Sequence, residues 1–302
     1  MHYELIIIWA GSAGLPAGMY ASRCSIKNLI IGSFPGGALA TSHKVENYPW
    51  VLSAGGKEIM ENFKKHAENA GSEILQDTVE SVEKKEETFF IKTLSGKEFT
   101  SDYIILATGN QYRHLEVPWE NEFLGKWVSY CATCDGAFFK WLEVVVAWGG
   151  NTALTEALYL ADICKTVKIV HRRDTFRAED IWVNQAKKRE NIEFYLNEEI
   201  ESINGWLFME EVKLKSGKML KADGIFIAVG TIPFTKIIDA LWPQKDEEWC
   251  LVVDKRQQTS VPWLFAAGDV TTNSNKFRQT IMSAAEWCLA ANSVHEEILH
   301  KK

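Results

Sequence analysis

The sequence predicts an α/β fold built from two units that each alternate strands and helices. Near the N-terminus an apolar run, Leu5 to Ile8, meets a turn of small residues and then a helical stretch from Leu15 to Cys24. Near the middle of the chain, Val144 to Val146 leads through Gly149-Gly150-Asn151 into a second helical stretch at about 152–161. A buried strand, a glycine-containing turn and a helix together begin a βαβ unit. Its repetition within 302 residues predicts two domains, each with its own core.

Further segments extend both units. Apolar runs that end in small or polar residues predict additional buried strands, at 29–31, 103–107, 167–170 and 264–267. A long helix is expected over about 280–299. Stretches that mix β-branched or aromatic residues with charged turns predict antiparallel hairpins, at 81–100 and 207–222. These patterns together predict two Rossmann-like dinucleotide-binding domains, each with a small antiparallel β-layer.

The composition is that of an ordinary soluble globular chain, with 46% apolar and 24% charged residues. A net charge of −7 argues against general binding to nucleic acid or to anionic membranes. No basic region precedes an apolar one at the N-terminus, and no apolar run is long enough to span a bilayer. We therefore expect neither a signal peptide nor a membrane partner. Six cysteines without a regular framework suit a reducing cytoplasm.

The segment Cys131-Ala132-Thr133-Cys134-Asp135 carries the clearest chemistry in the chain. Two cysteines at this spacing can close a small, reducible disulfide, and the Asp135 carboxyl can supply or accept the proton that thiol–disulfide exchange needs. A structural zinc site would need a second Cys or His pair, so we expect no metal. A chance, inert pair is the other alternative, but the following Asp135-Gly136 favours redox work. The remaining cysteines stand singly in apolar segments, at Cys24, Cys164, Cys250 and Cys288.

Each strand–turn–helix unit carries a variant of the dinucleotide fingerprint. Glycines let the backbone turn tightly and approach a pyrophosphate, which binds the unpaired N–H groups at the helix N-terminus. Both fingerprints keep the second glycine and a small third residue, and both have tryptophan at the first position; they read Trp9-Ala10-Gly11-Ser12-Ala13-Gly14 and Trp148-Gly149-Gly150-Asn151-Thr152-Ala153. The candidate phosphate-binding residues are Gly11, Ser12, Ala13 and Gly14 in the first turn and Gly149, Gly150, Asn151 and Thr152 in the second.

The residues that follow the second strand of each unit distinguish the nucleotides. Arginine there accommodates a ribose 2′-phosphate, whereas an acidic residue would bind a ribose 2′-hydroxyl. The second unit has His171-Arg172-Arg173 and Arg177, a run that favours NADPH over the alternative of a solvated basic turn. The first unit ends its strand at Gly32-Ser33 without an acidic residue, so its ribose contact is unassigned. A dithiol between two nucleotide fingerprints suggests that electrons pass from a nicotinamide through a flavin to the cysteines.

The chain resembles the low-molecular-weight thioredoxin reductases along essentially its whole length. The resemblance rests on the fingerprints, the Cys-Ala-Thr-Cys-Asp motif, the arginine run and shorter matches at Gly36-Gly37, Glu46-Asn47-Tyr48-Pro49, Ala107-Thr108-Gly109, Gly268-Asp269 and Arg278-Gln279. It implies an FAD domain made of residues 1–112 and 234–302, with an inserted NADPH domain, residues 113–233, that carries the CxxC motif. It also implies a cytoplasmic homodimer whose partner is thioredoxin or a thioredoxin-like protein.

The resemblance also implies roles for individual residues. Asp269 would bond the FAD ribitol, Arg278 and Gln279 would lie near the flavin at a helix start, and Asn47 would lie near the isoalloxazine. The remaining FAD-binding positions that it implies are Gly36, Gly37, Thr108, Gly109 and Gly268.

The same resemblance implies a reaction path. NADPH would reduce FAD, reduced flavin would open the Cys131–Cys134 disulfide with Cys134 facing the flavin, and Cys131 would attack the disulfide of thioredoxin. Asp135 would be the acid/base, with a helix N-cap as its alternative role. The inserted domain would rotate about two hinges, at about Arg113–Pro118 and Gly230–Pro233.

Two other functional hypotheses stay open. The first is a related disulfide reductase with another donor or acceptor: NADH, ferredoxin, or a glutaredoxin-like or peroxiredoxin partner. The arginine run argues against NADH and ferredoxin. The second is a cofactor-poor, inactive flavoprotein-like module whose nucleotide sites are blocked by Trp9 and Trp148.

Twelve tryptophans is an unusual number, and five of them stand where the resemblance leads us to expect glycine: Trp9, Trp50, Trp119, Trp148 and Trp263. Glycine is used at such sites for positive φ or for its lack of a Cβ. Three explanations are open: the sequence is unreliable at these positions, the chain is a deliberately altered variant, or the turns have re-formed around the indoles. We favour the first, because many such substitutions would be hard for one stable protein to absorb.

Overall fold

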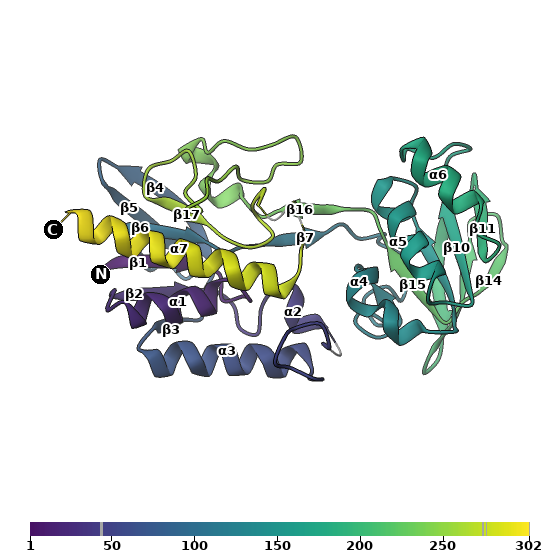
Figure 1. Cartoon of the computed structure of the whole chain (residues 1–302), viewed down its shortest axis with the longest axis horizontal. Helices are drawn as coiled ribbons and strands as arrows, with labels where there is room; N and C mark the ends of the chain where they lie inside the picture. The colour runs from purple at the N-terminus through teal and green to yellow at the C-terminus, as the bar shows by residue number, and fades with distance from the viewer. Residues whose placement is uncertain (43–44, 274, 276, 302) are drawn as a thin grey trace. The chain divides into compact units, whose positions relative to one another are not determined.

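The computed structural model describes residues 1–42, 45–273, 275 and 277–301, and the chain divides into two compact units (Figure 1). The first unit comprises Met1–Gln111 and Ile232–Lys302, and the second comprises Tyr112–Thr231. The segments that join them, β7 (Asn110–Tyr112) and β16 (Thr231–Pro233), pair as a two-stranded sheet. Each unit combines parallel and antiparallel strands, so the predicted α/β class is confirmed.

A seven-stranded sheet forms the centre of the first unit, in the order β3-β2-β1-β6-β5-β4 with β17 beside β6. The strands β3, β2, β1, β6 and β17 run parallel, so segments from both ends of the chain flank β6. β4 and β5 form the predicted hairpin and extend the sheet in an antiparallel sense. The strands are β1 (His2–Ile8), β2 (Asn28–Ile31), β3 (Glu73–Leu75), β4 (Val79–Lys85), β5 (Thr88–Thr93), β6 (Glu98–Leu106) and β17 (Leu264–Ala266).

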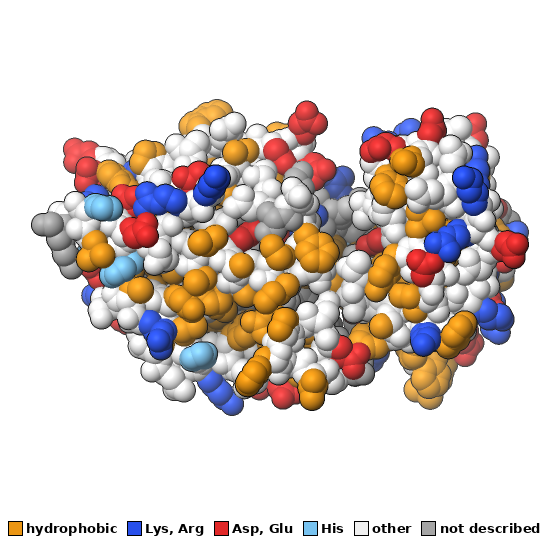
Figure 2. Space-filling view, in the orientation of Figure 1, with side chains coloured by type: hydrophobic (Ala, Val, Ile, Leu, Met, Phe, Trp, Pro, Cys, Tyr) orange, Lys and Arg blue, Asp and Glu red, His pale blue; other side chains and the backbone are white. Residues whose placement is uncertain are grey.

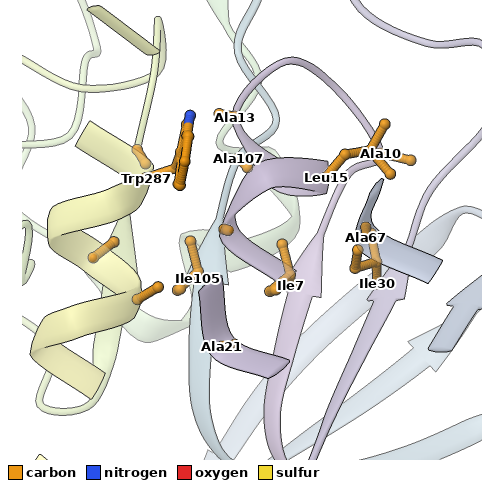
Figure 3. Close-up of a cluster of buried hydrophobic side chains, with 14 of the residues drawn as sticks. Ile7, Ala10, Ala13, Leu15, Ala21, Ile30, Ala67, Ile105, Ala107 and Trp287 are labelled. Atoms are coloured by element: carbon orange, nitrogen blue, oxygen red, sulfur yellow. The ribbon is translucent and has the colours of Figure 1, made fainter. Parts of the chain in front are cut away.

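The apolar strand β1 is buried on both faces of this sheet. Side chains alternate along a strand, so Ile7 belongs to the core on one face while Ile6 and Ile8 belong to the core on the other. Figure 3 shows Ile7, Ile30 and Ile105, from three neighbouring strands, on the face that the helices cover. α1 contacts both α3 and α7 on that face. The helices of the unit are α1 (Gly14–Arg23), α2 (Ala38–Thr41), α3 (Gly56–Ala70), the 3₁₀ helix η2 (Lys236–Leu241) and α7 (Thr280–Lys301).

The second unit is a three-layer arrangement around a five-stranded parallel sheet of order β11-β10-β9-β15-β8. α5 packs its small and apolar residues against one face, and the antiparallel sheet β12-β13-β14 supplies the core on the other. The strands are β8 (Val128–Ser129), β9 (Glu143–Ala147), β10 (Thr166–His171), β11 (Ile192–Leu196), β12 (Ile200–Gly205), β13 (Met209–Leu214), β14 (Met219–Lys221) and β15 (Gly224–Ile227). The helices are α4 (Ala132–Asp135), the 3₁₀ helix η1 (Gly136–Phe139), α5 (Asn151–Ala161) and α6 (Asp180–Lys187).

The surface carries charges of both signs. Figure 2 shows acidic and basic side chains interspersed on the face that it draws, in keeping with the moderate net charge of −7. Within the described ranges, no helix has the length and apolar character needed to cross a membrane.

Close backbone approach fixes the turn between β1 and α1. A Cβ added to Gly14 would lie 1.8 Å from the carbonyl oxygen of Trp9, and one added to Gly32 would lie 2.3 Å from the backbone nitrogen of Ala10. Real Cβ atoms do not come this close to backbone atoms. The first helix can therefore begin here only because these two residues lack side chains.

We predict that Gly14→Ala lowers the free energy of unfolding by about 3 kcal/mol, because the added methyl overlaps a backbone oxygen that cannot move freely. Gly150→Ala is the matched control, since Gly150 lies at the equivalent turn of the second unit, has φ of −92°, and has open space where a Cβ would lie. Denaturant unfolding measures both variants. Equal midpoints for the two variants would contradict the packing described for Gly14.

Candidate functional site

The two motif cysteines lie at the start of a short helix and form a disulfide, Cys131–Cys134. The chain reaches this turn from β8, whose last residue is Ser129. The backbone N–H of Cys131 donates to Ser129 Oγ at 3.1 Å, and the N–H of Asp135 donates to the carbonyl oxygen of Cys131 at 3.1 Å. The parallel sheet therefore positions the disulfide through a strand end and a single helical turn.

Asp135 lies directly after the disulfide and is held by Ser129, whose Oγ donates to Asp135 Oδ2 at 2.6 Å. Burial raises the pKa of the Asp135 carboxyl, and the hydrogen bond from Ser129 lowers it in part. A carboxyl with a raised pKa keeps its proton to higher pH and can donate it to a leaving thiolate. The Asp135 side chain makes no capping hydrogen bond at the start of η1, so this geometry suits proton transfer better than a capping role.

Glu156 is a second carboxyl beside the redox turn, and the sequence reasoning missed it. Its Oε1 accepts the backbone N–H of Ala132 at 3.4 Å, and its buried Oε2 has no hydrogen-bond partner among the described residues. Burial raises the pKa of Glu156 to about 7. The available sequence signal was a glutamate on the otherwise apolar face of α5, the helix against which α4 packs.

The first nucleotide turn lies between β1 and α1. Trp9 has φ of +98°, and its indole lies along the turn. A Cβ on Gly11 would lie 3.2 Å from Trp9 Cδ1, and one on Gly37 would lie 3.9 Å from Trp9 Nε1. Ser12 and Ala13 precede the helix, so the unpaired N–H groups expected to bind phosphate are present, with an indole beside them.

The structure brings several of the other sequence-predicted FAD residues into contact. Asn47 Nδ2 donates to Gln279 Oε1 at 3.0 Å. Gly268, with φ of +82°, lies against the first turn, since a Cβ on it would be 3.2 Å from Ala13 Cβ. Burial raises the pKa of Asp269 to about 6, although the nearby Arg278 guanidinium opposes this shift.

Residues 108–109 and the turn after β17 are held by contacts within the first unit. Thr108 Oγ1 donates to the carbonyl oxygen of Phe234 at 2.7 Å, and Gly109 adopts φ of +64°.

The buried Glu286, on α7, accepts the N–H of Gly268 at 2.8 Å and the hydroxyl of Thr271 at 3.1 Å. Sequence reasoning did not identify Glu286, whose only signal was an acid among the apolar and small residues of the first half of α7.

The second nucleotide turn opens on a cavity of about 350 Å³ within the second unit. Trp148, Arg172 and Lys215 line it, together with the acidic run Glu198-Glu199. The Arg172 guanidinium lies 5.2 Å from the centroid of the Trp148 ring, and Trp148 has φ of +109°. Four glutamates line this cavity, and the Lys215 amine lies 2.6 Å from Glu199 Oε2. Arg172 is therefore the basic side chain here that is placed to bind a phosphate.

The other members of the predicted second site take different positions. His171 is buried beneath the turn, where a Cβ on Gly149 would lie 2.6 Å from its ring, and burial lowers the pKa of this imidazole. Arg177 donates its backbone N–H to the carbonyl oxygen of Gly149 at 2.8 Å while its side chain is exposed, and the Arg173 side chain is also exposed.

At the start of α5, the Asn151 side chain donates a hydrogen bond to the Glu179 carboxylate and accepts one from the Glu179 backbone N–H. Gly150 and Thr152 lie at the start of α5.

Comparison with known proteins places this site in a class. The chain matches the pyridine nucleotide-disulphide oxidoreductase family over residues 3–286. It is 38% identical to the thioredoxin reductase of Treponema pallidum, over 96% of this chain and 95% of that protein. It is 39% identical to the glucosaminate ammonia-lyase of Pseudomonas fluorescens, over 96% and 94% respectively. The solved structure of thioredoxin reductase from Streptococcus pyogenes matches with a TM-score of 0.93 at 31% identity, over 99% of each chain.

The fold, the disulfide and the two nucleotide turns define a flavoprotein oxidoreductase of the pyridine nucleotide-disulphide class. Within that class, the chain belongs to the low-molecular-weight thioredoxin reductase family, as its identity over nearly the whole length establishes. Among the described residues, no group of three His, Cys, Asp or Glu side chains is arranged to hold a metal ion.

We predict that Glu156→Gln makes the stability of the protein less sensitive to pH. The pKa of Glu156 is raised in the folded state from 4.5 to about 7, so the unfolded chain releases this proton first and stability falls as pH rises through that window. Relative to the wild type, the variant should gain about 1–3 kcal/mol between pH 5 and pH 8, measured by denaturant unfolding. Glu190→Gln, at an exposed site, is the control. A wild-type pH dependence that Glu156→Gln leaves unchanged would contradict this account.

Proposed function

We propose that the chain is an NADPH-dependent thioredoxin-disulfide reductase that acts as a cytoplasmic homodimer. The observation that carries the proposal is the Cys131–Cys134 disulfide with the half-buried, hydrogen-bonded Asp135 carboxyl beside it. Family membership supports FAD and a nicotinamide cofactor, and the names of the relatives support thioredoxin as the partner.

The chain offers residues that fit both nucleotides. Gly11, Gly14, Gly37 and Gly268 form a cradle of small residues at the N-terminus of α1, which suits the pyrophosphate of FAD except where the Trp9 indole lies. Arg172, which directly follows β10 and lies beside Trp148, suits the 2′-phosphate of NADPH. Bound FAD would supply the electron pair, received from NADPH, that opens the disulfide.

The thiol chemistry follows from the chain's own residues. The Cys131 thiolate attacks one sulfur of the thioredoxin disulfide, forming a mixed disulfide and releasing a thiolate that Asp135 protonates. The Cys134 thiol then gives its proton back to Asp135 and attacks Cys131, which re-forms the Cys131–Cys134 bond and releases the second thioredoxin sulfur as a thiolate. A proton from solvent completes the dithiol form of thioredoxin. The thioredoxin disulfide gains the two electrons that the dithiol loses.

A second candidate function comes from the equally similar glucosaminate ammonia-lyase, which shows that identity at this level does not fix the reaction. An ammonia-lyase reaction has no evident need for a redox disulfide followed by an acid, so the CxxC turn favours the reductase. Thioredoxin reduction by NADPH is the deciding assay, with D-glucosaminate and NADH as alternative substrates. Ammonia release from D-glucosaminate without thioredoxin reduction would overturn the proposal.

We predict that Asp135→Asn lowers the rate of thioredoxin reduction by about 10²-fold or more, because the acid for the leaving thiolate is lost. Ser129→Ala should instead shift the alkaline limb of the pH–rate profile upward, since removing the bond that lowers the pKa of Asp135 lets the carboxyl keep its proton longer. Cys134→Ser, which cannot re-form the disulfide, is the inactive control. If Ser129→Ala shifted the limb downward, the assigned role of Asp135 would be wrong.

A further inference from the structure

Eight of the twelve tryptophans have a backbone conformation that residues with side chains rarely adopt. Their φ angles lie between +52° and +109°, a region where a Cβ crowds the neighbouring carbonyl group. A bulky residue with positive φ is a genuine outlier. The eight are Trp9, Trp50, Trp119, Trp141, Trp148, Trp242, Trp249 and Trp263.

In this respect the tryptophans behave as glycines do. Positive φ occurs at eight of the twenty glycines, and among the described residues at six others that are neither glycine nor tryptophan. The excess is therefore specific to one amino acid. Chance substitution would have spread such outliers over many residue types.

The side chains give an independent sign. An indole is usually largely buried, yet Trp50 is 101% exposed and Trp242 is 89% exposed.

At the two nucleotide turns, Trp9 and Trp148 occupy equivalent backbone positions, since Trp9 N donates to Ile31 O at 2.7 Å and Trp148 N donates to Val170 O at 2.9 Å. Both occupy the first-glycine position of a fingerprint.

We propose that the native protein has glycine at these eight positions, because a codon written as tryptophan, different from the codon of the other four tryptophans, is decoded as glycine. A single change of codon meaning accounts for all eight positions, whereas separate mutations would need the same unfavourable exchange at eight glycine-shaped turns. Both fingerprints then regain their first glycine, and no indole lies against Gly11 and Gly37 where the FAD pyrophosphate is expected. The identity of these eight residues does not depend on which acceptor the enzyme reduces.

Peptide mass spectrometry of the protein purified from its natural source tests this directly. Peptides that span positions 9, 148 and the six other sites should each be lighter by the difference between tryptophan and glycine. Tryptophan in native peptides at positions 9 and 148 would overturn the proposal.

Recombinant chains supply a second test that does not need the source organism. A chain with all eight tryptophans changed to glycine should unfold at higher denaturant than the chain as written, because eight strained residues are relieved. Trp182→Gly is the matched control: Trp182 lies in α6 with part of its ring in the core, so that change should lower the midpoint. A lower midpoint for the eight-glycine chain would contradict the proposal.

A separate observation concerns Glu120, a carboxylate buried to 2% exposure in the second unit. Three successive backbone N–H groups converge on it: Leu115 at 3.1 Å, Glu116 at 2.7 Å and Val117 at 3.4 Å. Glu116 takes φ of +60° to make this possible. The carboxylate therefore fastens the segment through which the chain enters the unit.

The same carboxylate reaches the residue before the redox disulfide. Tyr130 donates its hydroxyl to Glu120 Oε1, and its ring stacks on that of Tyr112 with centroids 4.7 Å apart. His114 Nδ1 lies 3.2 Å from the carboxylate and 2.7 Å from the Tyr130 oxygen. Burial and the bond to Glu120 hold the pKa of Tyr130 well above its usual value. Tyr130 directly precedes Cys131.

We infer that Glu120 is a positioning residue for Cys131: it ties the entering segment 114–117 to Tyr130 and so fixes the backbone from which the redox turn starts. The inference rests on the proposed role of Cys131 as the attacking sulfur, but its geometry does not require a bound cofactor. Because residues 114–117 are held to Tyr130 through Glu120, a rotation of one unit relative to the other would change the backbone of the connecting strands β7 and β16 and not that of residues 114–117.

Two measurements on the full-length protein test this role. Glu120→Gln should raise amide hydrogen exchange at residues 115–117 and change the rate at which iodoacetamide alkylates reduced Cys131 by between about twofold and thirtyfold. Tyr130→Phe should change the alkylation rate while leaving exchange at 115–117 as in the wild type. If hydrogen exchange rises in Glu120→Gln but the alkylation rate changes in neither variant, then Glu120 only holds residues 115–117 in place and does not position Cys131. Neither readout involves NADPH or thioredoxin, so failure here is distinct from failure of the proposed function.

Discussion

The two strand-to-helix turns are the constraint on which the nucleotide sites depend. At each turn the residue after the first strand must bond the end of the next strand through its backbone N–H, as Trp9 does to Ile31 and Trp148 to Val170. The backbone must then reverse with positive φ so that the helix can start at once. Gly14 shows how little room remains, since a methyl there would lie 1.8 Å from a carbonyl oxygen. Such a turn presents bare N–H groups to a phosphate only where side chains are missing.

Two half-buried carboxyl groups, those of Asp135 and Glu156, lie beside the redox turn. Asp135 and Glu156 both have raised pKa values because burial disfavours their charged forms. Asp135 directly follows Cys134, and Glu156 accepts a hydrogen bond from the backbone N–H of Ala132, between the two cysteines. A buried acid costs stability above its unfolded-state pKa. Acids with raised pKa values next to a disulfide are the pattern expected of a functional site.

Much of the fold could be predicted from local patterns. Strong apolar runs such as Leu5 to Ile8 and Val144 to Val146 predicted the central strands, and the turns that follow them predicted the helices. The strand β8, at Val128–Ser129, is too short to give a pattern and exists because it pairs with β15, almost a hundred residues later. Glu156 could not be predicted to lie beside the redox turn, because only tertiary packing brings α5 to Ala132.

We propose a flavoprotein in which electrons pass from one nucleotide site to the other and then to one disulfide. The visible absorption spectrum of the purified protein, recorded before and after anaerobic addition of NADPH, tests it most directly. The account predicts a flavin spectrum that NADPH bleaches, since electrons must enter at one site and reach the other. A colourless native protein that cannot be reconstituted with FAD would contradict it.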